Sequence, residues 1–317
     1  MFQKLKSYRR LLSTVEIERQ YGGILHRTLK IEVEKCGQKI PRFFYLQNRR
    51  HQMKKLTHLA LVCGLAFPLA GQAHDLWAYA QQAEAGKDLL AVLGYGDRFP
   101  EGEKIAEGRL NILNPLVLHS ADGKSTTLTQ KGENFHYVTT SPLAKAEYKI
   151  SGSYKPTFWS KNDNGWKREN LTQMKDANYC EESSMFASTY VNTGVDVSDF
   201  AIAPVGLPLE IVPLVDPTTL SPMEALPVQV LYQGQPAKGV SVIGTTNEFT
   251  KLDEKAVYDH REPQAFSGKT DAQGKVNFIP ALAGTWKIKA IYEMDYPDQK
   301  VCQKRKLYST YTFKVNK

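Results

Sequence analysis

Short hydrophobic runs that alternate with polar residues dominate the chain after residue 73. Alternation at every second position predicts a strand with one buried and one solvated face. The runs include LLAVLGYG, AEYKISGSY, LPVQVLYQG, KVNFIPA, TWKIKAIYE and STYTFKV. Turn sequences rich in Gly, Asp and Pro separate these runs. This arrangement is typical of sandwiches of antiparallel sheets, in which each sheet has one face exposed to solvent. The pattern therefore predicts an all-β fold, and only residues 171–190 have a spacing that suits a helix.

The strand pattern falls into two parts. The polar run NTGVDVSDFAIAP ends just before Val205 and Gly206 and interrupts the hydrophobic runs. We predict a β-rich N-terminal domain over residues 74–205 and a C-terminal β-sandwich domain over residues 206–317.

The turns of the C-terminal part have the residue types and order that are typical of immunoglobulin-like or transthyretin-like modules. A turn at Asp271 and Gly274 precedes one alternating run, and Gly284 precedes the next. Such turns between alternating runs are typical of β-hairpins, so we predict hairpin pairing here. Modules of this kind are usually not catalytic.

Residues 53–73, MKKLTHLALVCGLAFPLAGQA, have the order of a secretory signal: a positive start, a short hydrophobic stretch and a small-residue cleavage site. The hydrophobic stretch is too short and interrupted for a membrane span. We predict cleavage after Ala73, export to the periplasm by a Sec-type route, and no membrane-spanning segment afterwards. Residues 1–52 are then a mis-assigned leader upstream of a true start at Met53, or alternatively a genuine cytosolic extension.

Removing residues 1–73 changes the charge of the protein. The whole chain has a formal net charge of +8, but the part after residue 73 holds 27 basic and 29 acidic residues. The basic character therefore belongs to the leader and signal, and the mature protein is not expected to bind nucleic acid.

Two cysteines, Cys180 and Cys302, remain after the predicted cleavage. In an oxidising compartment a pair of this kind is most simply a disulfide, with two separate thiols as the alternative. The bridge would tie the middle of the chain to its last strand.

The mature sequence lacks the common catalytic and zinc motifs, including HExxH, paired CxxC, the G-x-S-x-G elbow, the P-loop and the dinucleotide fingerprint. We therefore predict that the protein is not an enzyme.

His74 stands apart because the predicted cleavage makes it the first residue. Its α-amine and ring nitrogen could chelate one transition-metal ion, a donor set that suits copper, nickel or zinc. Asp75, His136 and His260 are candidate supporting ligands. A solvated or structural histidine is the alternative at each position.

A second candidate site involves aromatic residues. Trp159 and Trp166 bracket a loop rich in amides, WSKNDNGW. Exposed aromatics beside amides suit the faces and hydroxyls of sugars, so this loop could bind a glycan or a surface partner. The alternative is that the two tryptophans only anchor the loop.

The motifs together resemble a known family. HDLWAYA directly after the signal, LGYGDRFPEGE, PTFWSKNDNGWK, LEIVPLVDP with LYQGQPAKGVSV, and TDAQGKVNFIPALAGTWKIKA are similar to the periplasmic component family linked to bacterial nickel and cobalt uptake. This family is often described only as a domain of unknown function. The resemblance extends over nearly all of residues 74–315.

The resemblance implies an exported, non-enzymatic protein that binds nickel or cobalt and passes it to the components of a membrane uptake transporter. It marks His74 and Asp75 as metal-site residues and Trp77 as packing. Asp97 and Arg98 stand where many relatives have a histidine, as do Glu293 and Asp295. A site with fewer imidazoles is richer in oxygen and binds nickel more weakly.

Overall fold

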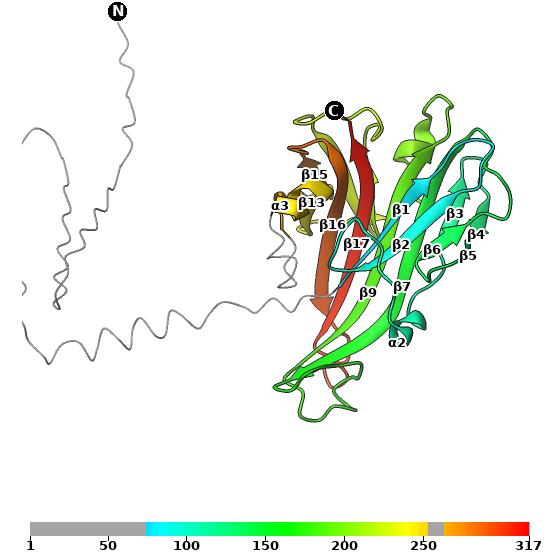
Figure 1. The fold of residues 1–317 in the computed structure, drawn as a ribbon. Coiled ribbons are helices and arrows are strands. Elements are labelled where there is room, and N and C mark those ends of the chain that lie inside the picture. The colour runs from blue at the N-terminus through cyan, green and yellow to red at the C-terminus, as the bar shows by residue number, and fades with distance from the viewer. Residues whose placement is uncertain (1–73, 253–262, 317) are drawn as a thin grey trace, which may run out of the picture. The chain divides into compact units, whose positions relative to one another are not determined.

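The computed structural model describes residues 74–252 and 263–316, and within them the fold is almost entirely β-structure (Figure 1). The all-β prediction is therefore confirmed. The predicted leader and signal lie outside the described residues, as does His260. No helix in the described part of the chain combines the length and the hydrophobicity that a membrane crossing requires.

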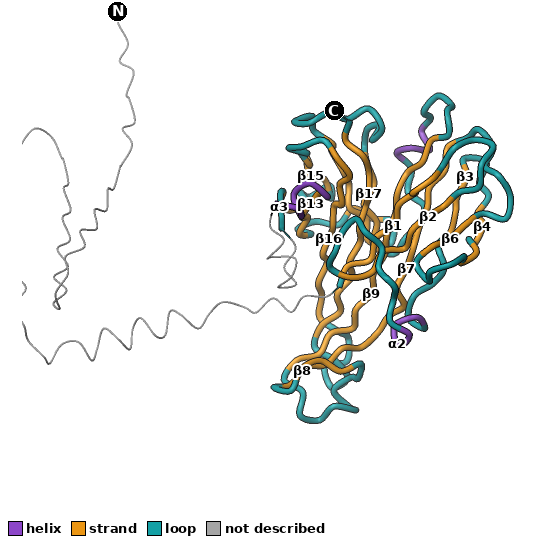
Figure 2. The backbone as a smooth tube through the Cα atoms, viewed as in Figure 1, coloured by secondary structure: helices purple, strands orange, loops and turns teal. Residues whose placement is uncertain are grey.

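The strands form three sheets, which Figure 2 traces along the backbone. The first has the order β1 (Asp75–Gln82), β2 (Leu90–Gly96), β6 (His136–Val138), β5 (Thr129–Gln130). The second has the order β10 (Leu209–Pro213), β11 (Leu226–Tyr232), β12 (Gln235–Pro236), with β15 (Lys275–Phe278) paired to β11. The third and largest has the order β14 (Phe266–Lys269), β13 (Ser241–Thr246), β16 (Gly284–Asp295), β17 (Lys304–Val315), β9 (Tyr179–Asn192), β7 (Glu147–Asn162), β3 (Val117–Ser120), β4 (Ser125–Thr127), with β8 (Gly165–Lys167) paired to β7.

Helical structure is confined to short segments within the described ranges. These are α2 (Glu107–Leu110), the 3-10 helix η1 (Asp199–Ile202) and α3 (Asn247–Leu252).

The largest sheet carries a hydrophobic core on each of its faces. On β9, Met185 and Ala187 belong to the core that also contains Leu76 and Leu93 of the first sheet. Phe186, between them, belongs to the core shared with the second sheet. Because side chains alternate between the faces of a strand, the two small sheets pack on opposite faces of one shared sheet.

Strand β9 corrects a prediction. Part of the stretch expected to be helical, residues 171–190, forms this central strand, so the helix prediction is wrong. The strand is paired on both edges and buried on both faces, and its small and polar residues hide the two-residue period. Tertiary pairing overrides local pattern at such a position.

The hairpin predicted around Gly284, between β15 and β16, is wrong. Strands β15 and β16 follow each other in sequence, but β15 pairs with β11 while β16 pairs with β13 and β17. The turns are present, and the chain uses them to cross between sheets. A sandwich permits this because consecutive strands can join its two layers.

The segment at the predicted domain boundary is held by two buried carboxylates. Glu147 accepts a hydrogen bond from the backbone N–H of Ser198 at 3.0 Å. Glu210 accepts three, from the N–H groups of residues 205–207, at 2.7 to 3.1 Å. Strands from both sides of residue 206 share the largest sheet, and the division into two domains stays a prediction.

The predicted disulfide is confirmed. Cys180 on β9 is bonded to Cys302, two residues before β17, with the two Cα atoms 5.1 Å apart. Both cysteines are fully buried. The bond joins residues separated by 122 positions in the chain and fixes the parallel pairing of β9 and β17 at its start.

Candidate functional site

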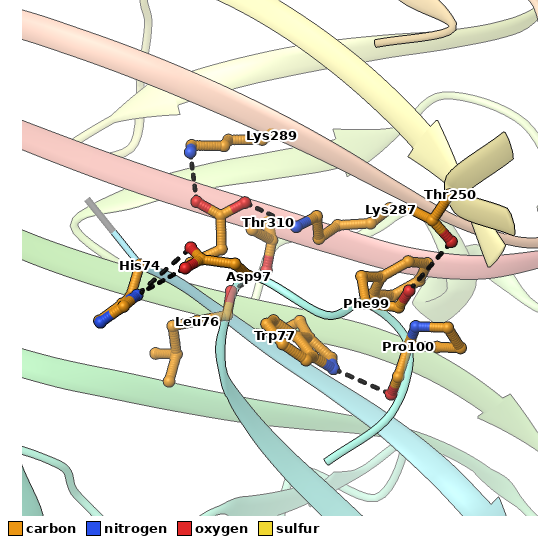
Figure 3. A network of polar contacts seen from close by, with 11 residues as sticks. His74, Leu76, Trp77, Asp97, Phe99, Pro100, Thr250, Lys287, Lys289 and Thr310 are labelled. Atoms are coloured by element: carbon orange, nitrogen blue, oxygen red, sulfur yellow. Dashed lines mark hydrogen bonds and ion pairs between the residues drawn. The ribbon is translucent and has the colours of Figure 1, made fainter. Parts of the chain in front are cut away.

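The register of β1 and β2 brings His74 and Asp97 together. These antiparallel strands pair Asp75 with Gly96, so the next pair along the hairpin is His74 with Asp97. The Nδ1 atom of His74 lies 3.2 Å from each carboxylate oxygen of Asp97 (Figure 3). The carboxylate accepts a hydrogen bond when Nδ1 carries a proton. Asp97 is thus a candidate site residue, although the sequence indicated only that it stands where many relatives have a histidine.

The ring of His74 is oriented by an aromatic neighbour. The Tyr95 ring meets it edge to face, with the ring centroids 5.4 Å apart. The His74 side chain is 39% exposed and that of Asp97 is 17% exposed, so a solute can reach the pair. The site is therefore held in place without being closed.

Trp77, for which the sequence predicted a packing role, fixes the pairing of β1 with β2. Its indole lies over Gly94, where a Cβ atom would come within 1.9 Å of the ring, so glycine is required there. The indole N–H donates to the carbonyl of Pro100 at 3.3 Å, and the ring packs against Phe99. These contacts anchor the segment that follows Asp97.

A pocket of about 600 Å³ opens beside His74 and Asp97. Its other charged lining residues are Arg98, Glu103, Lys104 and Arg109. Burial and the neighbouring Tyr154 raise the pKa of Tyr95, which also lines the pocket, to about 12. The Tyr95 hydroxyl accordingly stays protonated at neutral pH and accepts a hydrogen bond from Arg109 at 3.2 Å.

Asp75 faces away from this pocket. Its carboxylate is buried and accepts hydrogen bonds from Lys287, at 2.6 Å, and from Lys289. Both lysines, which are labelled in Figure 3, belong to β16. Burial alone would raise the pKa of Asp75, but the two ammonium groups hold it well below its usual range. Asp75 therefore links the first strand to the C-terminal part of the shared sheet.

Lys287 is almost fully buried and lies near two aromatic rings. Its ammonium nitrogen is 5.2 Å from the Trp77 ring centroid and 5.3 Å from that of Phe99. The Thr310 hydroxyl, on the adjacent strand β17, donates to the carbonyl of Leu76 at 2.7 Å. Ionic, cation–π and backbone contacts therefore all fix the start of β1.

His136 lies on β6, away from His74. It is paired with Val92, four residues before Gly96 on β2, which corresponds to roughly 13 Å along the strand. Its ring packs against Phe135, with the centroids 4.3 Å apart. In residues 74–252 and 263–316, no three His, Cys, Asp or Glu side chains are grouped so that they could hold one metal ion. The α-amine that His74 would have after the predicted cleavage is a main-chain donor and is not included among these side chains.

The two tryptophans differ in their surroundings. Trp159 packs against the first core, donates to the Tyr154 hydroxyl at 2.7 Å and carries the Arg109 guanidinium 4.4 Å above its ring. Trp166, on the β7–β8 hairpin, is 40% exposed and meets Tyr179 edge to face. Trp159 thus supports the pocket wall.

The acidic residues near the end of β16 lie in surface ion pairs. Glu293 and Asp295 contact Lys304 at 3.5 Å and 2.8 Å. Glu293 also contacts Lys306 at 3.4 Å.

Arg109 and Tyr95 were not singled out from the sequence. Tyr95 stands two residues before Asp97 in LGYGD, so the alternation that predicts the strand could have placed it on the same face as Asp97. Arg109 had no comparable signal, because only the tertiary structure places its guanidinium over the Trp159 ring of β7 and in the pocket lining.

Comparisons with known structures give only remote likenesses. Native alpha-2-macroglobulin from Escherichia coli, over domains MG0-NIE-MG1, is 10% identical, with 78% of this chain and 72% of that chain covered and a TM-score of 0.19. The Escherichia coli adhesin FdeC is 13% identical, with 77% and 64% covered and a TM-score of 0.20. No curated protein matches the sequence. A family model does match residues 71–294, and the chain belongs to the family described as Domain of unknown function (DUF4198).

Proposed function

We propose that this protein is a non-catalytic, exported protein that captures a divalent transition-metal ion, nickel or cobalt, at His74 and Asp97. The observation that carries the proposal is the contact between His74 Nδ1 and the Asp97 carboxylate at the mouth of an open pocket. With metal–ligand distances of about 2.0–2.2 Å, two neighbouring ligands of one metal ion lie about 2.9–3.4 Å apart. The observed 3.2 Å falls in this range, so a metal can replace the shared proton with little movement.

The α-amine of His74 supplies a third donor if the signal is removed after Ala73. An α-amine and Nδ1 of the same histidine close a six-membered chelate ring, which needs little additional ordering. Two nitrogen donors and one carboxylate suit nickel, cobalt, copper or zinc. We place Asp75 outside the set of ligands, because Lys287 and Lys289 already engage its carboxylate.

The role that we propose is capture of the ion in the periplasm and delivery to a membrane uptake transporter. The buried disulfide is compatible with an oxidising compartment. The partial exposure of the pair, 39% for His74 and 17% for Asp97, supports transfer, since a partner can reach a bound ion.

The test compares three forms of the protein: one that begins at His74, one with a single Ala added before it, and an Asp97→Asn variant. Intact mass of protein exported with its own signal first establishes the natural N-terminus. Calorimetry with nickel should then give one site with a Kd in the micromolar range or tighter for the form beginning at His74. Both altered forms should bind at least tenfold more weakly. Equal affinity of the Ala-extended form would contradict the terminal chelate.

A further inference from the structure

The pocket is much larger than one metal ion requires. Its volume is about 600 Å³, whereas six waters around one ion need about 180 Å³ at roughly 30 Å³ each. Pockets of about 300–1,000 Å³ are typical of sites for small organic molecules. The space beyond His74 and Asp97 therefore suits an organic ligand that accompanies the ion.

The pocket lining includes a guanidinium that has no carboxylate partner among residues 74–252 and 263–316. Arg109 is half-buried, and its contacts within the described ranges are the Tyr95 hydroxyl and the Trp159 ring. Arg98, by contrast, is paired with Glu103 at 3.7 Å. Lys104, which is exposed, adds a second cation that has no carboxylate partner among the described residues. This part of the pocket lining is suited to an anion.

Arg109 is also held in position. Next to it, Arg168 donates to the carbonyl of Gly108 at 3.1 Å and to the Asn111 side chain at 3.0 Å. On the other side, Asn134 exchanges two hydrogen bonds with the backbone of Ile105, at 2.8 Å and 2.7 Å. With the neighbouring segments held and its guanidinium over the Trp159 ring, Arg109 loses little freedom when it binds a carboxylate in the two-point geometry that it favours.

We propose that the cargo is a metal chelate, in which the ion is bound to a small di- or tricarboxylate and not delivered as a bare ion. The ion occupies His74 and Asp97, and a carboxylate of the chelator binds Arg109, with Lys104 adding longer-range attraction. The inference rests on the proposed function, since it assigns the substrate class of the same site. Arg98 and Glu103, which pair with each other, also line the pocket.

The test uses the form beginning at His74 and three probes: nickel chloride, a 1:1 nickel–citrate complex, and citrate alone. Native mass spectrometry of the wild-type protein should retain nickel and citrate together. Calorimetry should show that Arg109→Gln weakens nickel–citrate binding at least tenfold, while nickel taken from the chloride binds within threefold of wild type. Lys131→Gln removes an exposed positive charge outside the pocket and should leave both affinities unchanged.

The outcomes separate the two proposals. Retention of nickel without citrate, or equal nickel–citrate affinity of Arg109→Gln and wild type, would overturn the chelate inference and leave metal capture standing. Citrate bound as tightly without nickel would also overturn it. Failure of the wild-type protein to bind nickel from either source would overturn the proposed function itself. Unchanged binding of nickel chloride by Arg109→Gln shows that the variant is folded around His74.

Discussion

Two neighbouring residues, His74 and Asp75, each form a charged contact, but in different surroundings. The first contact, with Asp97, lies at the mouth of a pocket, and its side chains are 39% and 17% exposed. The second, with Lys287 and Lys289, has a carboxylate that is 7% exposed and a Lys287 side chain that is 2% exposed. One step along the strand thus moves from an accessible site to a buried one, because successive side chains point to opposite faces.

The difference in burial determines what each contact can do. Partly exposed ion pairs contribute about 0–1 kcal/mol, so we expect the His74–Asp97 pair to add little to the stability of the fold. Removal of one partner from a buried pair costs about 3–5 kcal/mol, because it leaves an uncompensated charge. We therefore expect Asp75 to act in the stability of the fold, and we propose Asp97 for metal capture.

The largest effect should come from Asp75→Asn. We expect the free energy of unfolding to fall by about 3–5 kcal/mol, because two buried or nearly buried ammonium groups lose their carboxylate. Urea denaturation at pH 7 measures the change. A loss below about 1 kcal/mol would show that Asp75 does not hold β1 in place.

The disulfide should affect stability and not the pocket. Replacing Cys180 and Cys302 by alanine should lower the free energy of unfolding by about 2–5 kcal/mol, since the bond closes a long loop. Nickel affinity should stay within threefold of wild type, because the bond joins the starts of β9 and β17 and neither cysteine lines the pocket. Calorimetry on the folded variant tests this, and a large loss of affinity would link the two regions.

Asp97→Asn should give the opposite result to Asp75→Asn. We expect nickel affinity to fall at least tenfold, which corresponds to about 1.4 kcal/mol, while the free energy of unfolding changes by about 1 kcal/mol at most. Paired calorimetry and urea titrations on the two variants measure both quantities. Similar stability losses in the two variants would remove the distinction between the contacts.

The buried contact should also respond to acid. The folded-state pKa of Asp75 is below its unfolded value of about 3.9, so its stabilising contribution is complete above that pH and is lost as the pH falls further. The stability difference between wild type and Asp75→Asn should therefore be constant from pH 5 to 7. It should shrink by at most about 1.4 kcal/mol per pH unit below pH 4. Urea midpoints at several pH values follow it, and a difference that grows in acid would reverse the assignment.

The smallest effect should come from Trp166→Ala, on the hairpin outside the pocket. Because this side chain is 40% exposed, we expect the free energy of unfolding to change by about 0.5 kcal/mol or less and nickel affinity to stay unchanged. Glycan-array binding by wild type that this variant loses would instead support the alternative role for the tryptophans.

Much of the fold followed from local patterns. The alternating runs identified β11, β16 and β17 as strands. The two cysteines in the part predicted to be exported correctly predicted the disulfide between them. Strand β9 was missed because a strand buried on both faces shows no simple period. The hairpin prediction failed because a turn sequence specifies a reversal of the chain but not the sheet that the next strand joins.

The sequence by itself determined most of the strands, the disulfide partners and the special position of His74 behind a predicted cleavage site. Only the tertiary structure decided that Asp97 faces His74, that Asp75 is buried against Lys287, and that Arg109 reaches the same pocket. The physical reason is that alternation along one strand fixes which face a side chain occupies. The side chain opposite depends on register and on packing between segments as far apart as β1 and β16, which no local pattern encodes.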